Sequence, residues 1–144
     1  MSIKIIADSC CDITPEMEKS INISRIPLQI NVGDHVFTDN ENIDIKEMLG
    51  QIKQVKSGLS TACPSPEEFS RQMQGDEEVF CVALSSQLSG TYNSARIGAQ
   101  LSALESPRKK IHVFDSQSAS AGETRIAMKI DSLYKAGAVF EEVV

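Results

Sequence analysis

Residues 85 to 95 read Ser85-Ser86-Gln87-Leu88-Ser89-Gly90-Thr91-Tyr92-Asn93-Ser94-Ala95. The apolar run at residues 79–84 that precedes them is rich in residues that favour strands and is too short to cross a membrane. The residues from Ala95 to Leu101 have the composition of a helix. The stretch is therefore predicted to be a hydroxyl-rich turn with one glycine, between a buried strand and the beginning of a helix.

The turn is a candidate anion site, because free backbone N–H groups and the positive end of the helix dipole meet at the beginning of a helix. Ser89 stands beside Gly90, whose missing side chain lets a ligand approach the backbone. No lysine or arginine occurs between Val79 and Ala95. Hydroxyl and amide donors without a cation suit a single carboxylate better than a polyphosphate.

The whole chain has 144 residues, enough for one domain with a substantial core. Its 14 basic and 20 acidic residues give a net charge of −6, which argues against nucleic acid or an anionic membrane surface as the main partner. No apolar run reaches the roughly 18 residues that a membrane helix needs, and the first residues lack a signal-peptide pattern. We therefore expect a cytoplasmic protein with no transmembrane segment.

The four cysteines have neither zinc-ligand nor CxxC spacing, so free thiols are expected. Cys10 and Cys11 follow a predicted strand end, which leaves a redox role open for them, although nothing nearby is expected to lower a thiol pKa.

Strand and helix patterns alternate along the rest of the chain. Strands are predicted at residues 3–7, 25–32, 79–84 and 110–114, with a hairpin from residue 32 through Gly33-Asp34 to residues 35–38. Helices are predicted after the capping residues Thr14, Asp44 and Ser65, and around residues 126–134. Residues 60–64 are expected to be a loop. Strands separated by helices imply crossover connections, and hence an α/β fold: a three-layer domain whose mainly parallel sheet is flanked by helices.

Three predicted strands end in polar turns, at Asp8-Ser9, Ser85-Ser86 and Asp115-Ser116. Such ends line one edge of an open parallel sheet, where ligands bind, so their convergence is a candidate site. Asp8, Asp12 and Asp115 could together hold a divalent cation, but a role as turn formers or helix caps is the interpretation we favour.

Hydrolase and nucleotide chemistry find little support in the sequence. The G-x-S-x-G nucleophile elbow is absent around Ser89, and the two histidines, His35 and His112, are predicted away from the strand ends. Neither glycine-rich nucleotide loop occurs. We predict a binding protein that is not an enzyme and uses no cofactor or metal.

Residues 85–95 are similar to the SSxLSGTYxSA signature of the DegV family. Three further stretches match the family in order: Asp8-Ser9, residues 60–66 as its TSxPS loop, and residues 115–124 as its DSxxxSxGxG segment. Ala62 and Cys63 depart from the loop pattern, and Glu123-Thr124 replaces the second glycine of the last motif. The resemblance covers the whole chain.

The family consists of bacterial fatty-acid-binding proteins, some of which are the acyl-carrying subunit of fatty acid kinase. The resemblance implies a long-chain fatty acid between two domains, its carboxylate held by Thr61 and Ser89, to which we add the N–H group of Gly90. The expected pocket edge consists of Asp8, Ser9, Ser86, Thr91, Asp115 and Ser116. An ATP-dependent kinase subunit would phosphorylate the bound carboxylate, so this chain would present the substrate without being the catalyst.

Members of the family are about twice this length and have a second domain, whose histidine contributes to the carboxylate site. We expect residues 1–144 to be the N-terminal domain, with the second domain absent from this chain. The open half-tunnel leads us to expect self-association, or a disordered end after Ala138. Two other functions stay open: a small-substrate enzyme of related fold, and an interaction module that another chain completes.

Overall fold

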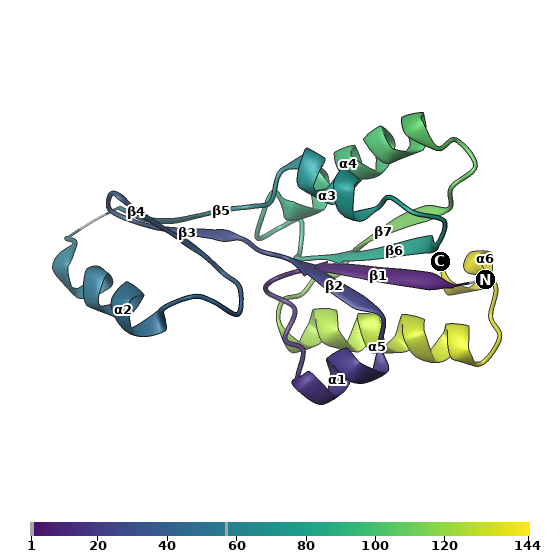
Figure 1. The fold of residues 1–144 in the computed structure, drawn as a ribbon, viewed down its shortest axis with the longest axis horizontal. Helices are drawn as coiled ribbons and strands as arrows, with labels where there is room; N and C mark the ends of the chain where they lie inside the picture. The colour runs from purple at the N-terminus through teal and green to yellow at the C-terminus, as the bar shows by residue number, and fades with distance from the viewer. Residues whose placement is uncertain (1, 57) are drawn as a thin grey trace.

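The computed structural model describes residues 2–56 and 58–144. Its main sheet has four parallel strands in the order β2-β1-β6-β7. Their bounds are β1 Ile3–Asp8, β2 Ile23–Ile26, β6 Glu78–Ala83 and β7 Ile111–Asp115. The helices are α1 Pro15–Ser20, α2 Ile45–Gln54, α3 Pro66–Gln72, α4 Thr91–Glu105, α5 Ala121–Lys135 and α6 Phe140–Val143. Helices α3 and α4 lie on one side of the sheet, and α1 and α5 on the other (Figure 1). The predicted three-layer α/β fold is confirmed.

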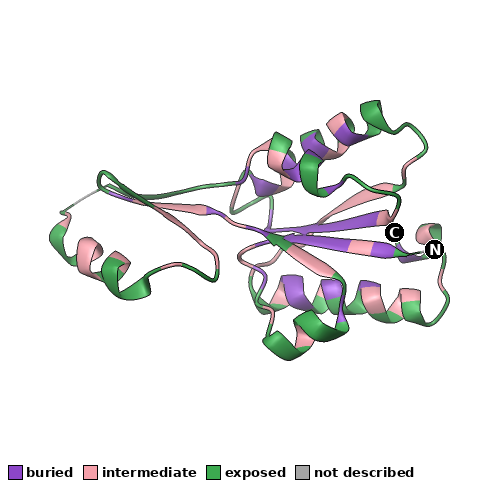
Figure 2. Cartoon of the chain, viewed as in Figure 1, coloured by how far each residue is buried: buried purple, intermediate pink, exposed green. Residues whose placement is uncertain are grey.

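The two central strands, β1 and β6, contribute side chains to both faces of the sheet, because successive residues of a strand point in opposite directions. Ile5 and Phe80 pack with residues of α5 and α6. Their neighbours Ile6 and Cys81 pack with residues of α3 and α4. Figure 2 shows the resulting burial along both strands. It explains why their sequences are nearly continuous apolar runs.

The last residues complete the core on the α5 side. The ring of Phe140 in α6 stacks on that of Phe80, with the centroids 4.8 Å apart, and Val143 is buried. The expectation of a disordered end after Ala138 is therefore wrong, because these residues form a helix packed on the sheet.

An arm, residues 29–62, extends from the main body (Figure 1). It contains α2 and a three-stranded antiparallel sheet in the order β4-β3-β5, with β3 Gln29–Val32, β4 His35–Thr38 and β5 Leu59–Ala62. The predicted hairpin is confirmed: Gly33, at φ +58°, begins the two-residue turn between β3 and β4, as mirror-type hairpin turns require. The predicted loop at 60–64 is partly wrong, because its first residues pair with β3 and place Thr61 opposite Ile30.

The single strand predicted at 25–32 is two strands in different sheets. The chain leaves the main sheet after Ile26 and enters the arm at Gln29. Pro27 has no N–H group to continue a ladder, and the N–H of Leu28 donates to Ser9 Oγ at 3.0 Å instead. The break is therefore fixed by local chemistry at the base of the arm.

The predicted helix caps are confirmed. Asp44 Oδ1 accepts from the N–H of Glu47 at 2.8 Å, and Ser65 forms a reciprocal capping box with Glu68. Helix α4 begins earlier than its composition suggests, at Thr91. None of the helices in the described ranges has the length and apolar content required to cross a membrane.

Candidate functional site

The carboxyl ends of β1, β6 and β7 meet at one edge of the sheet, as predicted. Asp8 at the end of β1 accepts a hydrogen bond from the N–H of Leu84 at 2.7 Å. Asp115 at the end of β7 accepts from the N–H of Ser86 at 3.0 Å and from its hydroxyl at 2.5 Å. These contacts join the turns after the three strands into one surface.

Asp8 and Asp115 are turn formers, as in the interpretation we favoured, whereas the Asp12 carboxylate accepts a hydrogen bond from the hydroxyl of Ser120. Asp8 Oδ1 also accepts from the N–H of Cys10 at 3.0 Å, and Asp115 Oδ1 from that of Gln117 at 3.1 Å. The hydrogen bonds from Ser86 lower the pKa of Asp115. Ser116 Oγ accepts from the N–H of Ser118 at 3.2 Å. Within residues 2–56 and 58–144, no group of three or more potential ligands could hold a metal ion.

Ser9 lies at the base of the arm. Its hydroxyl oxygen accepts a hydrogen bond from the N–H of Leu28. Ser9 also lines a pocket together with Arg25, Pro27, Asp39, Asn40 and Glu41. Its role in the described contacts is therefore to orient the arm relative to the sheet.

Ser89 and Gly90 form the entrance to α4. Gly90 is the N-cap residue and is exposed, and as a glycine it provides no side-chain cap. The 15-residue helix therefore presents the positive end of its dipole at this point. This is the position at which the sequence predicts a carboxylate site, and that assignment stays a prediction.

Thr91 is completely buried, so it reaches the surface only through Ser89. The two hydroxyl oxygens are 2.8 Å apart, and the N–H of Thr91 donates to Ser89 Oγ at 3.2 Å. A serine hydroxyl has one proton and two acceptor sites. When the Thr91 hydroxyl also donates, both acceptor sites of Ser89 are filled, and its own proton is left for a ligand.

The end of β5 lies beside the entrance to α4. Cys63 Sγ is 3.5 Å from the position that a Cβ atom would occupy at Gly90. Thr61 precedes this cysteine by two residues and is exposed. The loop that the resemblance selects is thus adjacent to the signature turn, although the two are distant in sequence.

The thiols of Cys10 and Cys11 are poorly suited to redox chemistry. Burial, with the nearby carboxylates of Asp8 and Glu123, raises their pKa values to about 12 and about 11. The thiolate is the reactive form, and it is scarce at neutral pH under these conditions. All four cysteines are free.

Two residues at this edge, Glu123 and Thr124, are buried although the sequence does not predict it. Glu123 and Thr124 follow Ser120 at the beginning of α5, and both are buried. Glu123 Oε2 accepts from the N–H of Ser120 at 3.1 Å, and the Thr124 hydroxyl donates to the carbonyl oxygen of Asp12 at 2.6 Å. The only sequence signal for them is that they replace a glycine of the family motif.

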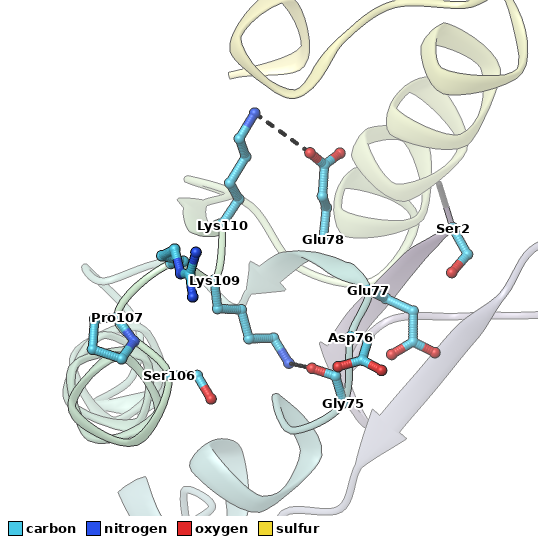
Figure 3. Close-up of a pocket in the computed structure, with 10 residues that line it drawn as sticks. Ser2, Gly75, Asp76, Glu77, Glu78, Ser106, Pro107, Lys109 and Lys110 are labelled. Atoms are coloured by element: carbon cyan, nitrogen blue, oxygen red, sulfur yellow. Dashed lines mark hydrogen bonds and ion pairs between the residues drawn. The ribbon is translucent and has the colours of Figure 1, made fainter.

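A pocket of about 810 Å³ lies elsewhere, between the loops that precede β6 and β7 (Figure 3). Its lysines are engaged by the protein: Lys109 Nζ donates to the carbonyl oxygen of Gly75 at 2.8 Å, and Lys110 Nζ is 3.5 Å from a carboxylate oxygen of Glu78. This pocket is at the amino ends of β6 and β7, whereas the candidate site is at their carboxyl ends.

Comparison with known proteins gives consistent results. A family model described as "Uncharacterised protein, DegV family" matches residues 2–144. A DegV domain-containing protein of Streptococcus pneumoniae is 37% identical over 146 residues, which cover 100% of this chain and 52% of that protein. The chain thus spans about half the length of the curated relatives that it matches.

Solved structures share the fold. A DegV family protein of Ruminococcus gnavus, described with vaccenic acid, superposes with a TM-score of 0.92 at 43% identity, covering 98% of this chain and 51% of that one. The Fatty Acid Kinase (Fak) B3 protein of S. pneumoniae, loaded with linoleic acid, gives 0.87 at 37% identity, covering 99% and 52%. A DegV family protein of Eubacterium eligens, loaded with heptadecanoic acid, gives 0.89 at 30% identity, covering 99% and 51%. Since the family model covers nearly the whole sequence and the fold agrees throughout, the chain belongs to the DegV family.

Proposed function

We propose that this chain binds a long-chain fatty acid by its carboxylate, at the entrance to α4. The observation that carries the proposal is the contact of Ser89 Oγ with the N–H and the hydroxyl of Thr91. With the Thr91 hydroxyl as donor, Ser89 keeps its own proton for the ligand. The N–H group of Gly90 and the helix dipole add to the attraction for an anion. Thr61 is the fourth contributor, from the end of β5.

The solved relatives support this choice of ligand. Three of them contain vaccenic, linoleic or heptadecanoic acid, and all three share the fold of this chain over nearly its whole length. The absence of lysine and arginine from residues 79–95 fits a single carboxylate better than a phosphorylated ligand.

We propose that the chain presents the bound acid to an ATP-dependent kinase subunit and does not itself catalyse the transfer. The support is the similarity to the Fak B3 protein, together with a sequence that lacks a nucleotide loop and a nucleophile elbow. The location that we propose is the cytoplasm, where ATP is available to such a partner.

We further propose that residues 1–144 correspond to the N-terminal domain of the family and that a second domain completes the acyl site. The arm exposes several large apolar side chains: Val36, Ile45, Leu49 and Leu59. A second domain would cover such surface. Alone, the 144-residue chain is expected to self-associate, which sedimentation velocity over a range of concentrations measures.

Mass spectrometry of the ligands extracted from freshly purified protein tests the proposed function. A co-purified long-chain fatty acid in stoichiometric amount is the expected result. Protein that carries none, and that also fails to bind added fatty acid, contradicts the proposal and favours the interaction-module alternative.

A further inference from the structure

Two carboxyl side chains are buried together beneath the candidate site. Asp8 ends β1 and Glu123 lies in the first turn of α5, and both are completely buried. Asp8 accepts from the N–H groups of Leu84 and Cys10, at 2.7 and 3.0 Å. Glu123 Oε2 accepts from the N–H of Ser120 at 3.1 Å. Three of the four carboxyl oxygens therefore have backbone donors.

The fourth oxygen, Glu123 Oε1, has no conventional donor. It is buried, and no N–H or hydroxyl group of the described residues reaches it. The carboxyl groups of Asp8 and Glu123 are within hydrogen-bonding range of each other. Two ionised carboxylates only accept, so they cannot bond to each other. A proton shared within the pair supplies the missing donor.

Glu123 is the member of the pair that keeps the proton. Burial and the neighbouring Asp8 carboxylate raise the pKa of Glu123 to about 8. Burial also raises the pKa of Asp8, but the N–H groups of Leu84 and Cys10 and a hydrogen bond from Glu123 oppose this effect. Asp8 is therefore the ionised partner, with three donors.

We propose that Glu123 is a positioning residue for the candidate site: it donates its proton to Asp8 and thereby fixes the turn that presents Ser89. The link is short. Asp8 holds the N–H of Leu84, and the N–H of Ser89 donates to the carbonyl oxygen of Ser85 at 3.0 Å. The turn is thus anchored to the carboxyl pair through Leu84, the residue that precedes it.

A second connection runs through the turn before α5. Ser120 has φ +56°, a value that favours glycine. It is held there by the Glu123 carboxylate oxygen at its N–H and by Asp12 at its hydroxyl. In the same turn, the carbonyl oxygen of Ser118 accepts from the N–H of Ser85 at 3.0 Å. Glu123 therefore supports the signature turn from two sides.

The charges that act on Glu123 are the carboxylates of Asp8 and Asp12, and both favour retention of the proton. Burial also raises the thiol pKa of Cys81, in β6. Besides the pair itself, Asp39 acts on the thiol of Cys10 and Arg25 on that of Cys11. Helix α5 also carries Arg125 and Lys129, and β7 carries His112, whose pKa is lowered by burial.

Amide hydrogen exchange of the 144-residue chain between pH 6 and 9 tests the proposal, with rates expressed relative to an unstructured chain at each pH. In the wild type, protection of Leu84 and Ser89 should fall about tenfold from pH 7 to pH 9, because only about a tenth of Glu123 keeps its proton one unit above a pKa of about 8. In Glu123→Gln, whose amide donates without titrating, protection should stay constant. Glu142→Gln is the matched control, since Glu142 holds the N–H of Val139 at 2.9 Å in the same way but is exposed.

Infrared spectroscopy detects the proton directly. The wild type at pH 7 should show the carbonyl band of a protonated carboxylic acid, which Glu123→Gln lacks. If Glu123→Gln does not fold, Asp8→Asn replaces it: removal of the Asp8 charge should move the titration of that band below its wild-type midpoint. A wild type without the band, or equal pH dependence of exchange in the wild type and Glu123→Gln, overturns the proposal.

The identity of the ligand rests on the proposed function, so fatty acid binding is measured separately. The quantity compared at each pH is the ratio of the fatty acid affinities of the wild type and Glu123→Gln. The ionisation of the acid itself cancels in this ratio. The wild type should lose affinity relative to Glu123→Gln by about tenfold between pH 7 and pH 9. A constant ratio overturns the positioning of Ser89. If neither protein binds fatty acid at any pH, the proposed function fails, while exchange and infrared still decide the role of Glu123.

Discussion

The hydroxyl of Ser94 donates a hydrogen bond to the carbonyl oxygen of Pro64 at 2.5 Å, in a buried environment. Ser94 lies in the first turn of α4, four residues after Gly90, whereas Pro64 lies three residues after Thr61. This one contact fixes the two parts of the proposed carboxylate site relative to each other.

Replacing Ser94 by alanine should separate these two parts. The carbonyl oxygen of Pro64 would lose this buried donor, which costs about 1–3 kcal/mol of stability, and fatty acid affinity should fall as well. Chemical denaturation and ligand titration measure the two effects. Ser102→Ala is the control, because Ser102 is buried in the same helix but about two turns further along. Equal affinities for Ser94→Ala and Ser102→Ala would show that the contact has no part in binding.

Thr91 should affect binding although it does not touch the ligand. Thr91→Val keeps the shape of the side chain and the N–H donor to Ser89, but it removes the hydroxyl that lies 2.8 Å from Ser89 Oγ. One acceptor site of Ser89 is then unfilled, and the Ser89 proton is no longer held in the direction of the ligand. The affinity for fatty acid should therefore fall by several-fold, which is less than in Ser89→Ala. An isothermal titration of the three proteins measures this order. A Thr91→Val protein that binds as tightly as the wild type contradicts the proposed direction of the hydroxyl pair.

The sequence predicts the main sheet well, because β1 and β6 are buried on both faces and leave continuous apolar runs. It also predicts the edge where Asp8, Ser86 and Asp115 meet, since polar turns follow the strands. It does not predict β5, all of whose residues are exposed, so no alternation of apolar side chains identifies the strand. The division of residues 25–32 between two sheets depends on Leu28 reaching Ser9, a contact that no local pattern indicates.

The sequence does not predict the Glu123–Asp8 pair either, because the pairing depends on tertiary structure. A glutamate in the first turn of a helix is normally a capping residue that favours the helix dipole. Only the tertiary structure shows that β1 brings a second carboxyl beside it. Burial then converts an ordinary cap into a group whose pKa is raised to about 8.

Gly98 should not tolerate alanine. A Cβ atom there would lie 2.6 Å from Phe69 Cβ and 2.7 Å from the carbonyl oxygen of Pro66, so α3 and α4 would have to separate. The expected loss is about 1–3 kcal/mol, against a gain of about 1 kcal/mol from helix propensity.

Gly50→Ala in α2 is the matched control, because, apart from the adjoining residues and the backbone of its own helix, no atom of the described residues lies within 4 Å of its Cβ position. It should keep the propensity gain and stabilise the arm or leave it unchanged. Urea unfolding of both variants measures the difference. Gly98→Ala as stable as the wild type would mean that the helices adjust their spacing without cost.

The carboxylate site itself makes the sharpest prediction. Hydrogen bonds to a charged group contribute roughly 1.5–3 kcal/mol each, so Thr61→Val and Ser89→Ala should each weaken binding of a free fatty acid about tenfold or more. The fold should persist, because neither side chain belongs to the core. The methyl ester of the same acid should bind the wild type more weakly and be nearly indifferent to both substitutions. Ser60→Ala is the control, since successive residues of a strand point to opposite faces and Ser60 instead accepts from Asn31 Nδ2 at 3.2 Å. If both variants bind the free acid as tightly as the wild type does, Thr61 and Ser89 do not hold the carboxylate.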